Sequence, residues 1–220
     1  MRPLMSAVVG CLVGYTLAPG SCFVGLDQPA PGPPGLARQL VTAATTPREW
    51  IVKTNCTADV LNTPSGTWLV TASHCLTENG SIEAAGATFT IVRSVDAADT
   101  MPSADLGLVQ VDGDIASAVG GGFTVGTAPE AGSRVSVYGY PWDEDALTGC
   151  DGLQVADHLG YPEVSGCSLP DGVSGGAWFS PDGVLRGVTG GLDEGGTLDD
   201  VTYTSPFTPE VVDWIRSVTD

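Results

Sequence analysis

The sequence predicts an all-β fold, either a barrel or a sandwich. From about Arg48 onward, short runs rich in β-branched and aromatic residues follow one another, and glycine- and proline-containing turns separate them. No long amphipathic helical stretch lies between these runs, which argues against a parallel sheet because such sheets need crossover helices. A chain of 220 residues is the right size for one domain, or for one domain built as two halves around a cleft.

The individual strands follow from alternation of apolar and polar residues and from turn residues at their ends. The runs that we expect as strands are, in chain order, WIVKT (50–54), a hairpin within ADVLNTPSGTWLVTASHC (58–75), ATFTIVRSV (87–95), LGLVQVDG (106–113), SRVSVYGYP (133–141), and a hairpin within GAWFSPDGVLRGVTGG (176–191).

One helix is predicted, at the C-terminus. Thr208 is a suitable N-cap, Pro209 suits the first helical position, and Glu210 complements the helix dipole. Apolar side chains then recur near one face of the predicted helix, at Val211, Val212 and Ile215.

The charge of the chain excludes one class of function. The net charge is -18, with only 8 lysines and arginines. A nucleic-acid-binding protein needs clustered basic residues to replace phosphate counterions, and this chain has none. An anionic membrane surface is disfavoured for the same reason, while the negative charge favours cationic ligands.

The N-terminus resembles an export signal. Arg2 is followed by the apolar stretch SAVVGCLVGYTL and by small residues around Gly20, so we expect a signal peptide over residues 1–20. The apolar stretch is too short to span a bilayer. Residues 21–47 include the segment QPAPGPPG and are expected to form a linker or propeptide. The chain is therefore expected to be secreted, without a membrane contact after signal removal, and to place its folded domain at residues 48–220.

The cysteines fit an exported protein, in which disulfides persist. Four of the six lie in two close-spaced sets, which favours the pairs Cys56–Cys75 and Cys150–Cys167, although four cysteines allow three pairings. A zinc site is the competing interpretation, but the short ligand spacings of zinc sites are absent. No cofactor motif and no metal-ligand spacing occurs in the sequence.

The segment LPDGVSGGAWF (169–179) holds a candidate nucleophile, Ser174. It fits three interpretations: a plain glycine turn, the G-x-S-x-G elbow of α/β-hydrolases, or the nucleophile loop of a protease. A serine needs a base, and the chain offers only His74 and His158. His74 directly follows an apolar strand, whereas His158 lies in a polar stretch that we expect to be a solvated loop.

The carboxylate that would orient this histidine is best placed at Asp105, which heads the apolar strand LGLVQV. A partly buried carboxylate there needs a hydrogen-bond donor, and a histidine N–H can supply it. Asp96 and Asp99 lie in a more polar run and are expected at the surface. The resulting order is His74, Asp105, Ser174, whereas an α/β-hydrolase places its acid and histidine after the serine. The elbow interpretation therefore fails.

The chain resembles the trypsin/chymotrypsin family of serine endopeptidases, especially its short secreted bacterial members. The resemblance rests on CTADVLNTPSGTWLVTASHC, ADLGLVQV, DGVSGGAW and VVDWIRSV, and it covers roughly residues 49–220. It implies two six-stranded antiparallel β-barrels with a C-terminal helix, acting on protein or peptide substrates as a monomer without a cofactor.

The resemblance also implies site roles. His74 would be the general base, Asp105 its orienting carboxylate and Ser174 the nucleophile, with the backbone N–H groups of Gly172 and Ser174 as the oxyanion hole. The substrate pocket would be lined by Ser168, Thr189, Gly190, Gly191 and Val201. The acidic residues 193, 194, 199 and 200 either place negative charge at the mouth of this pocket or form a solvated loop.

Two departures from the family pattern motivate an alternative. Val173 stands where the family carries an aspartate next to the nucleophile, so the loop must be held by packing or other hydrogen bonds. Gly190 aligns with the serine that supports the buried aspartate in the family. Both departures could loosen the catalytic geometry, so the alternative is a catalytically inactive trypsin-like fold that serves as an extracellular binding module.

Overall fold

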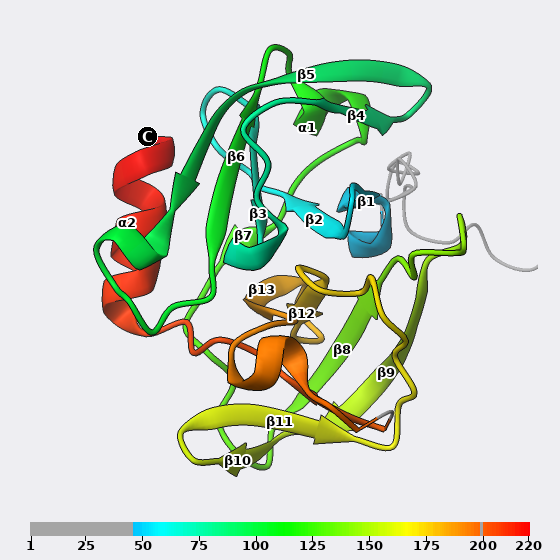
Figure 1. Cartoon of the computed structure of the whole chain (residues 1–220), viewed down its shortest axis with the longest axis vertical. Helices are drawn as coiled ribbons and strands as arrows, with labels where there is room; N and C mark the ends of the chain where they lie inside the picture. Colours follow the sequence, from blue (N-terminus) through cyan, green and yellow to red (C-terminus); the bar gives the residue numbers. More distant parts are fainter. Residues whose placement is uncertain (1–45, 199) are drawn as a thin grey trace, which may run out of the picture. The chain divides into compact units, whose positions relative to one another are not determined.

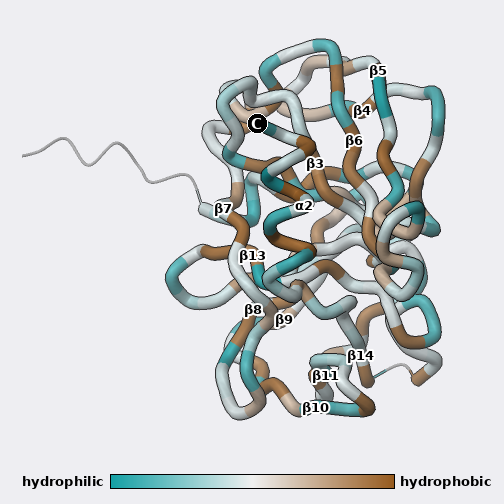
Figure 2. The backbone as a smooth tube through the Cα atoms, turned by 90° about the vertical axis from the view of Figure 1, so that its left-hand side faces the viewer, coloured by the Kyte–Doolittle hydropathy of each residue, from teal (hydrophilic) through white to brown (hydrophobic). Residues whose placement is uncertain are grey.

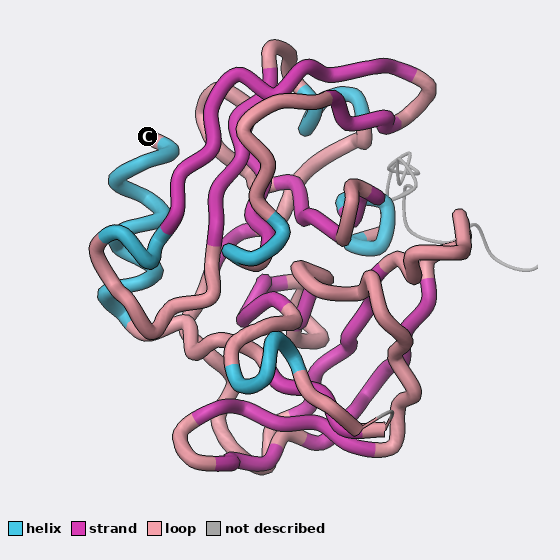
Figure 3. Tube along the Cα trace, in the orientation of Figure 1, coloured by secondary structure: helices cyan, strands magenta, loops and turns pink. Residues whose placement is uncertain are grey.

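The computed structural model describes residues 46–198 and 200–220. The predicted signal peptide and almost all of the predicted linker lie outside these residues. Strands dominate the described chain, and short helical turns occupy several of the loops between them (Figure 3). No described helix is both long and apolar enough to cross a membrane.

The first half of the described chain forms a six-stranded antiparallel sheet in the order β1-β2-β3-β6-β5-β4. Its strands are β1 (Ile51–Lys53), β2 (Thr57–Val60), β3 (Trp68–Thr71), β4 (Ser81–Ala84), β5 (Ala87–Asp96) and β6 (Gly107–Val111). The two edge strands, β1 and β4, approach each other, so the sheet curls into a near-barrel.

The second half distributes its strands over two sheets. The larger sheet has the order β7-β13-β12-β8-β9, with β13 and β7 parallel and the other pairs antiparallel, and the smaller sheet has the order β10-β11-β14. The strands are β7 (Thr124–Val125), β8 (Arg134–Gly139), β9 (Thr148–Gln154), β10 (Ala156–His158), β11 (Tyr161–Ser165), β12 (Ala177–Phe179), β13 (Val184–Val188) and β14 (Val201–Tyr203).

The helical segments are short, apart from the last one. They are η1 (Pro47–Trp50), η2 (Ser73–Cys75), η3 (Ala97–Asp99), α1 (Ile115–Ala118), η4 (Leu192–Gly195) and α2 (Pro209–Thr219). The predicted C-terminal helix is confirmed, and the Thr208 hydroxyl accepts a hydrogen bond from the Val211 N–H at 3.3 Å as its cap.

The core has two main parts. Ala58, Val60 and Leu69 belong to an apolar cluster inside the six-stranded sheet. The largest cluster instead joins that sheet to β12, β13 and α2, so that the C-terminal helix returns to the first half after the second half is complete (Figure 1). Hydrophobic segments along β3 and β6 are visible in Figure 2. Burial of this shared cluster holds the two halves together.

Sequence reasoning missed β4, β7, β9, β10, β11 and β14, and it placed His158 in a solvated loop. His158 is exposed as expected, but it ends β10 in a hairpin with β11. The pattern failed here because β9 and β10 contain no fully buried residue, so they lack the apolar alternation from which a strand is predicted.

Candidate functional site

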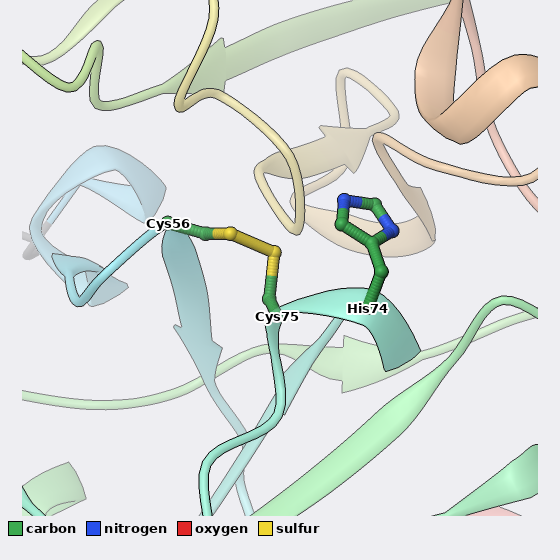
Figure 4. Close-up of side chains that lie close together, drawn as sticks. All are labelled: Cys56, His74 and Cys75. Atoms are coloured by element: carbon green, nitrogen blue, oxygen red, sulfur yellow. A yellow bond between two sulfur atoms is a disulfide. The ribbon is translucent and has the colours of Figure 1, made fainter.

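His74 lies on a single helical turn, η2, which directly follows the buried strand β3. The disulfide between Cys56 and Cys75 ties this turn to the start of β2, and the Asn55 side chain donates to the Cys75 carbonyl at 3.2 Å. Figure 4 shows the His74 ring and the disulfide projecting from the same segment. The disulfide and the hydrogen bond therefore restrict the conformational freedom of the backbone that carries His74.

The sulfur atoms near His74 do not make a metal site. The two cysteines and His74 bring potential ligand atoms within 4.8 Å of one another. Both sulfurs are consumed in the disulfide, however, and only a thiolate is a strong ligand for zinc. The second disulfide joins Cys150 to Cys167, so both pairs are the ones that the spacing of the cysteines favours.

Asp105 directly contacts His74. The Nδ1 atom of His74 is 2.9 Å from Oδ2 and 3.1 Å from Oδ1 of Asp105, and the His74 backbone N–H donates to Oδ1 at 3.2 Å. Both side chains are only partly exposed, His74 by 25% and Asp105 by 18%. The two hydrogen bonds from His74, one from its backbone N–H and one from its ring, fix both the position of the Asp105 carboxylate and the orientation of the imidazole.

Residues of the second half complete the surroundings of Asp105. The Gly191 N–H donates to Oδ2 at 2.9 Å, and the Asp105 N–H donates to the Ser205 hydroxyl at 3.0 Å. A Cβ atom on Gly190 would lie 2.8 Å from Oδ2, so this glycine leaves room for the carboxylate. Sequence reasoning missed Ser205, because nothing in its neighbourhood in the chain relates it to a residue 100 positions earlier.

The electrostatics of the pair follow from these contacts. The hydrogen bond to Asp105 raises the pKa of His74 above its ordinary value; burial opposes this effect, and the negative charges of Asp105 and Glu194 add to it. Burial acts to raise the pKa of Asp105, but the hydrogen bonds from His74 and Gly191 outweigh it and the pKa is lowered. The carboxylate is thus charged at neutral pH, and the imidazole is a stronger base than an isolated one.

The segment that carries Ser174 is held against the first half of the chain. The Thr57 N–H donates to the Ser174 carbonyl at 2.9 Å, and the Thr57 hydroxyl donates to the Gly172 carbonyl at 3.3 Å. Gly175 is at φ +78°, and a Cβ atom there would lie 2.2 Å from the Thr57 carbonyl oxygen. Only glycine permits this close approach of two backbones.

Two backbone N–H groups of this segment point away from internal partners. Among the residues that the structure describes, the N–H groups of Gly172 and Ser174 make no hydrogen bond. Gly172 is at φ +99°, in the region that favours glycine, and a Cβ atom there would meet the Trp142 backbone nitrogen at 2.3 Å. Backbone N–H groups without an internal partner can donate to a carbonyl or carboxylate oxygen of a bound molecule.

The Ser174 hydroxyl has no hydrogen-bond partner within residues 46–198 and 200–220. The structure thus shows a bonded His74–Asp105 pair, but no direct Ser174–His74 bond. Catalytic hydrogen bonds are often long in the absence of substrate and tighten only when it binds.

The residues expected to line a substrate pocket have different surroundings. Thr189 is buried, and its hydroxyl accepts from the Trp178 indole N–H at 3.0 Å. Gly190 and Gly191 lie against Asp105 as described above, whereas Ser168 is exposed. Val201 is half-buried and pairs with Ser165 between β11 and β14.

Asp96 differs from its expected position at the surface. Its Oδ1 atom accepts from the Ser73 hydroxyl at 2.7 Å and from the Ala98 N–H at 2.8 Å. Asp96 therefore caps η3 and connects it to the turn that carries His74. Asp99 is exposed, as expected.

Comparisons with known proteins agree with this architecture. No protein-family model matches the sequence, and no curated protein is detectably similar to it. Solved structures are similar, however. A thermostable serine protease from an extremophilic microorganism superposes with a TM-score of 0.61 at 18% identity, covering 76% of this chain and 94% of that one.

Two further structures extend the comparison. Protease Anisep from Arthrobacter nicotinovorans gives a TM-score of 0.62 at 17% identity and covers 77% of this chain and 93% of its own. A Glu endopeptidase gives 0.65 at 15% identity, with 82% and 94% covered. Together with the near-barrel, the second set of sheets and the C-terminal helix, these similarities show that the chain has the chymotrypsin fold of serine proteases.

Proposed function

We propose that this chain is a secreted serine endopeptidase, with Ser174 as nucleophile, His74 as general base and Asp105 as the carboxylate that orients the base. The observation that carries the proposal is the bonded His74–Asp105 pair, together with a serine among glycines for which the N–H groups of Gly172 and Ser174 make no hydrogen bond within the described residues. The similarity to serine proteases supports the same reaction class, and its substrates would be peptide bonds of proteins.

The chemistry follows from these roles. Ser174 Oγ attacks the carbonyl carbon of the scissile bond, and its proton passes to His74 Nε2. The N–H groups of Gly172 and Ser174 stabilise the oxyanion of the tetrahedral intermediate, each donor lowering the barrier by about 3 kcal/mol. When the intermediate collapses, His74 gives the proton to the leaving amine and an acyl-enzyme remains. Water then attacks the acyl-enzyme by the same steps and regenerates Ser174.

The two disulfides support the proposed location outside the cell, because disulfides persist in oxidising compartments. The substrate pocket proposed from the family resemblance comprises Ser168, Thr189, Gly190, Gly191 and Val201. No metal or cofactor is required for these steps, since the general base and the oxyanion donors are all supplied by the chain.

The decisive experiment is covalent labelling with a fluorophosphonate probe. Ser174 Oγ would form a bond to phosphorus, fluoride would leave, and the hydroxyl proton would pass to His74. We expect labelling of the full chain that Ser174→Ala abolishes and that Ser217→Ala preserves, because Ser217 lies on α2 and, within the described residues, its hydroxyl donates only to the Trp214 carbonyl. Absence of labelling in a folded, disulfide-bonded sample would contradict the proposal.

The pH dependence of the labelling rate tests the base. Since the pKa of His74 is raised above 6.5, the rate should fall as the pH drops from about 8 toward 6 and His74 becomes protonated. A rate that stays constant over this range would exclude His74 as the base.

The alternative function, a catalytically inactive binding module, is favoured by one observation: the Ser174 hydroxyl has no partner among the described residues. If the serine were idle, the folded protein would not react with the probe and would not cleave a protein substrate. The labelling experiment therefore separates the two functions directly.

A further inference from the structure

A cavity of about 370 Å³ lies beside His74, on the side of Asp105. His74, Asp105, Gly191 and Glu194 form part of its wall, and small residues between Ala98 and Ala104 form much of the remainder. Its size suits one long side chain of a bound peptide, since pockets for small ligands start at about 300 Å³.

Glu194 gives this cavity a negative charge that no lysine or arginine of the described residues neutralises. Asp105 is already bonded to His74 and Gly191, so its oxygens are occupied. The Glu194 side chain makes no ion pair with any described residue, and the cavity lining contains neither lysine nor arginine. Glu194 and His74 line the same cavity, and the negative charge of Glu194 adds a small contribution to the raised pKa of His74.

The backbone around Glu194 adopts an energetically unfavourable conformation. Asp193 and Glu194 have φ values of +50° and +56°, in the left-handed region that costs an ordinary residue about 1 kcal/mol or more. Gly195 and Gly196 follow at φ +114° and +124°. Of the two acidic residues, only Glu194 belongs to the cavity wall. Asp193 therefore serves as a control, because it has an acidic side chain and a positive φ like Glu194 but lies outside the cavity wall.

We propose that Glu194 makes this cavity a specificity site for a lysine or arginine side chain of the substrate, close to the peptide bond that is cut. This inference rests on the proposed function. The aliphatic stem of the basic side chain packs against the alanine and proline residues of the wall, and its charge meets the Glu194 carboxylate. The net charge of -18 adds a general attraction for cationic peptides.

Binding to the Ser174→Ala variant tests the inference without requiring catalysis. Each position of a nine-residue alanine-based peptide would carry arginine or, as its neutral counterpart, citrulline, and the dissociation constants would be measured by calorimetry. At one position we expect arginine to bind roughly fivefold more tightly than citrulline, as for an ion pair with an exposed carboxylate. This preference should shrink in 1 M salt, where charges are screened over about 3 Å.

Two further variants assign the preference to Glu194. In the Ser174→Ala background, Glu194→Gln should reduce the arginine preference to within about twofold, while Asp193→Asn should retain it. No preference at any position, or an equal loss in both variants, would overturn the inference. Failure of the proposed function gives a different pattern: the wild-type chain would not react with the fluorophosphonate probe, while the arginine preference of the Ser174→Ala variant would still be measurable.

Discussion

Asp59 is a carboxyl group buried among apolar residues. It is fully inaccessible, and neither of its oxygens has a hydrogen-bond partner within the described residues. Its strand partners Ile51 and Val70, and Leu61 two residues further along the chain, all belong to the cluster that joins the two halves. Burial raises the pKa of Asp59 well above its usual value, so the uncharged form is favoured in the folded chain.

This residue makes stability depend on pH. The folded state holds the Asp59 proton to a higher pH than the unfolded chain does, so the destabilisation by this group is smallest below about pH 3.9 and grows as the pH rises toward the folded pKa. Asp59→Val should therefore raise the free energy of unfolding at pH 7.5 by about 1–3 kcal/mol, and by less at pH 4. Urea denaturation at both pH values measures the difference.

A matched control for this prediction is Glu83→Val, which removes an exposed carboxylate from β4 of the same sheet. Its effect on stability should be similar at both pH values. A gain from Asp59→Val that is equal at pH 4 and pH 7.5 would show that the carboxyl group is not the origin of the effect.

At the scale of the elements, the loop around Ser174 is held by packing in place of an ion pair. Val173 is 6% exposed and packs closely against Gly139 of β8. A Cβ atom added to Gly139 would lie 2.8 Å from the Cβ atom of Val173. The Gly175 N–H donates to the Thr189 carbonyl at 2.8 Å, and the Gly176 N–H donates to the Val173 carbonyl at 2.9 Å. The sequence predicts that packing or hydrogen bonds hold this loop, and the structure contains both.

Substitutions at Val173 test this interpretation. Val173→Asp should lower the free energy of unfolding by about 3–5 kcal/mol, because it buries a charge against β8 with no partner. Val173→Ala should cost about 2 kcal/mol, since it only removes apolar contacts. Chemical denaturation gives both values. A Val173→Asp variant as stable as the wild type would mean that a partner for the aspartate exists.

At the scale of the whole molecule, the site depends on contacts between the two halves. Asp105 belongs to the first half, but Gly191 and Ser205 of the second half hold it in place. In the same way, Thr57 of the first half holds the segment that carries Ser174. Each half supplies residues that position the other half's proposed catalytic group, so a loosened interface would disturb both groups together.

The two disulfides should stabilise this arrangement by similar amounts. Their sequence separations are 19 and 17 residues, and closing loops of this size contributes about 3 kcal/mol each in the chain-entropy view. Replacing either pair by serines should therefore lower the free energy of unfolding to a similar extent in urea denaturation. A loss confined to one pair would show that strain or packing, and not loop closure, sets its contribution.

The sequence by itself determined the fold class and the C-terminal helix, and it proposed His74 and Asp105, which the structure brings into contact, as members of one candidate site with Ser174. Apolar alternation, turn residues and the order of His74, Asp105 and Ser174 are local patterns or simple orderings, so they can be read along the chain. The exposed strands β9 and β10 escaped prediction because they lack that alternation.

Only the tertiary structure decided how the site is held together. The Ser205 support of Asp105, the packing of Val173 on Gly139, the unpartnered Asp59 carboxyl group and the position of Glu194 in a cavity wall all depend on residues far apart in the chain. Hydrogen bonding, burial and the field of a charge depend on distance in space, and these distances exist only after the two halves have packed against each other.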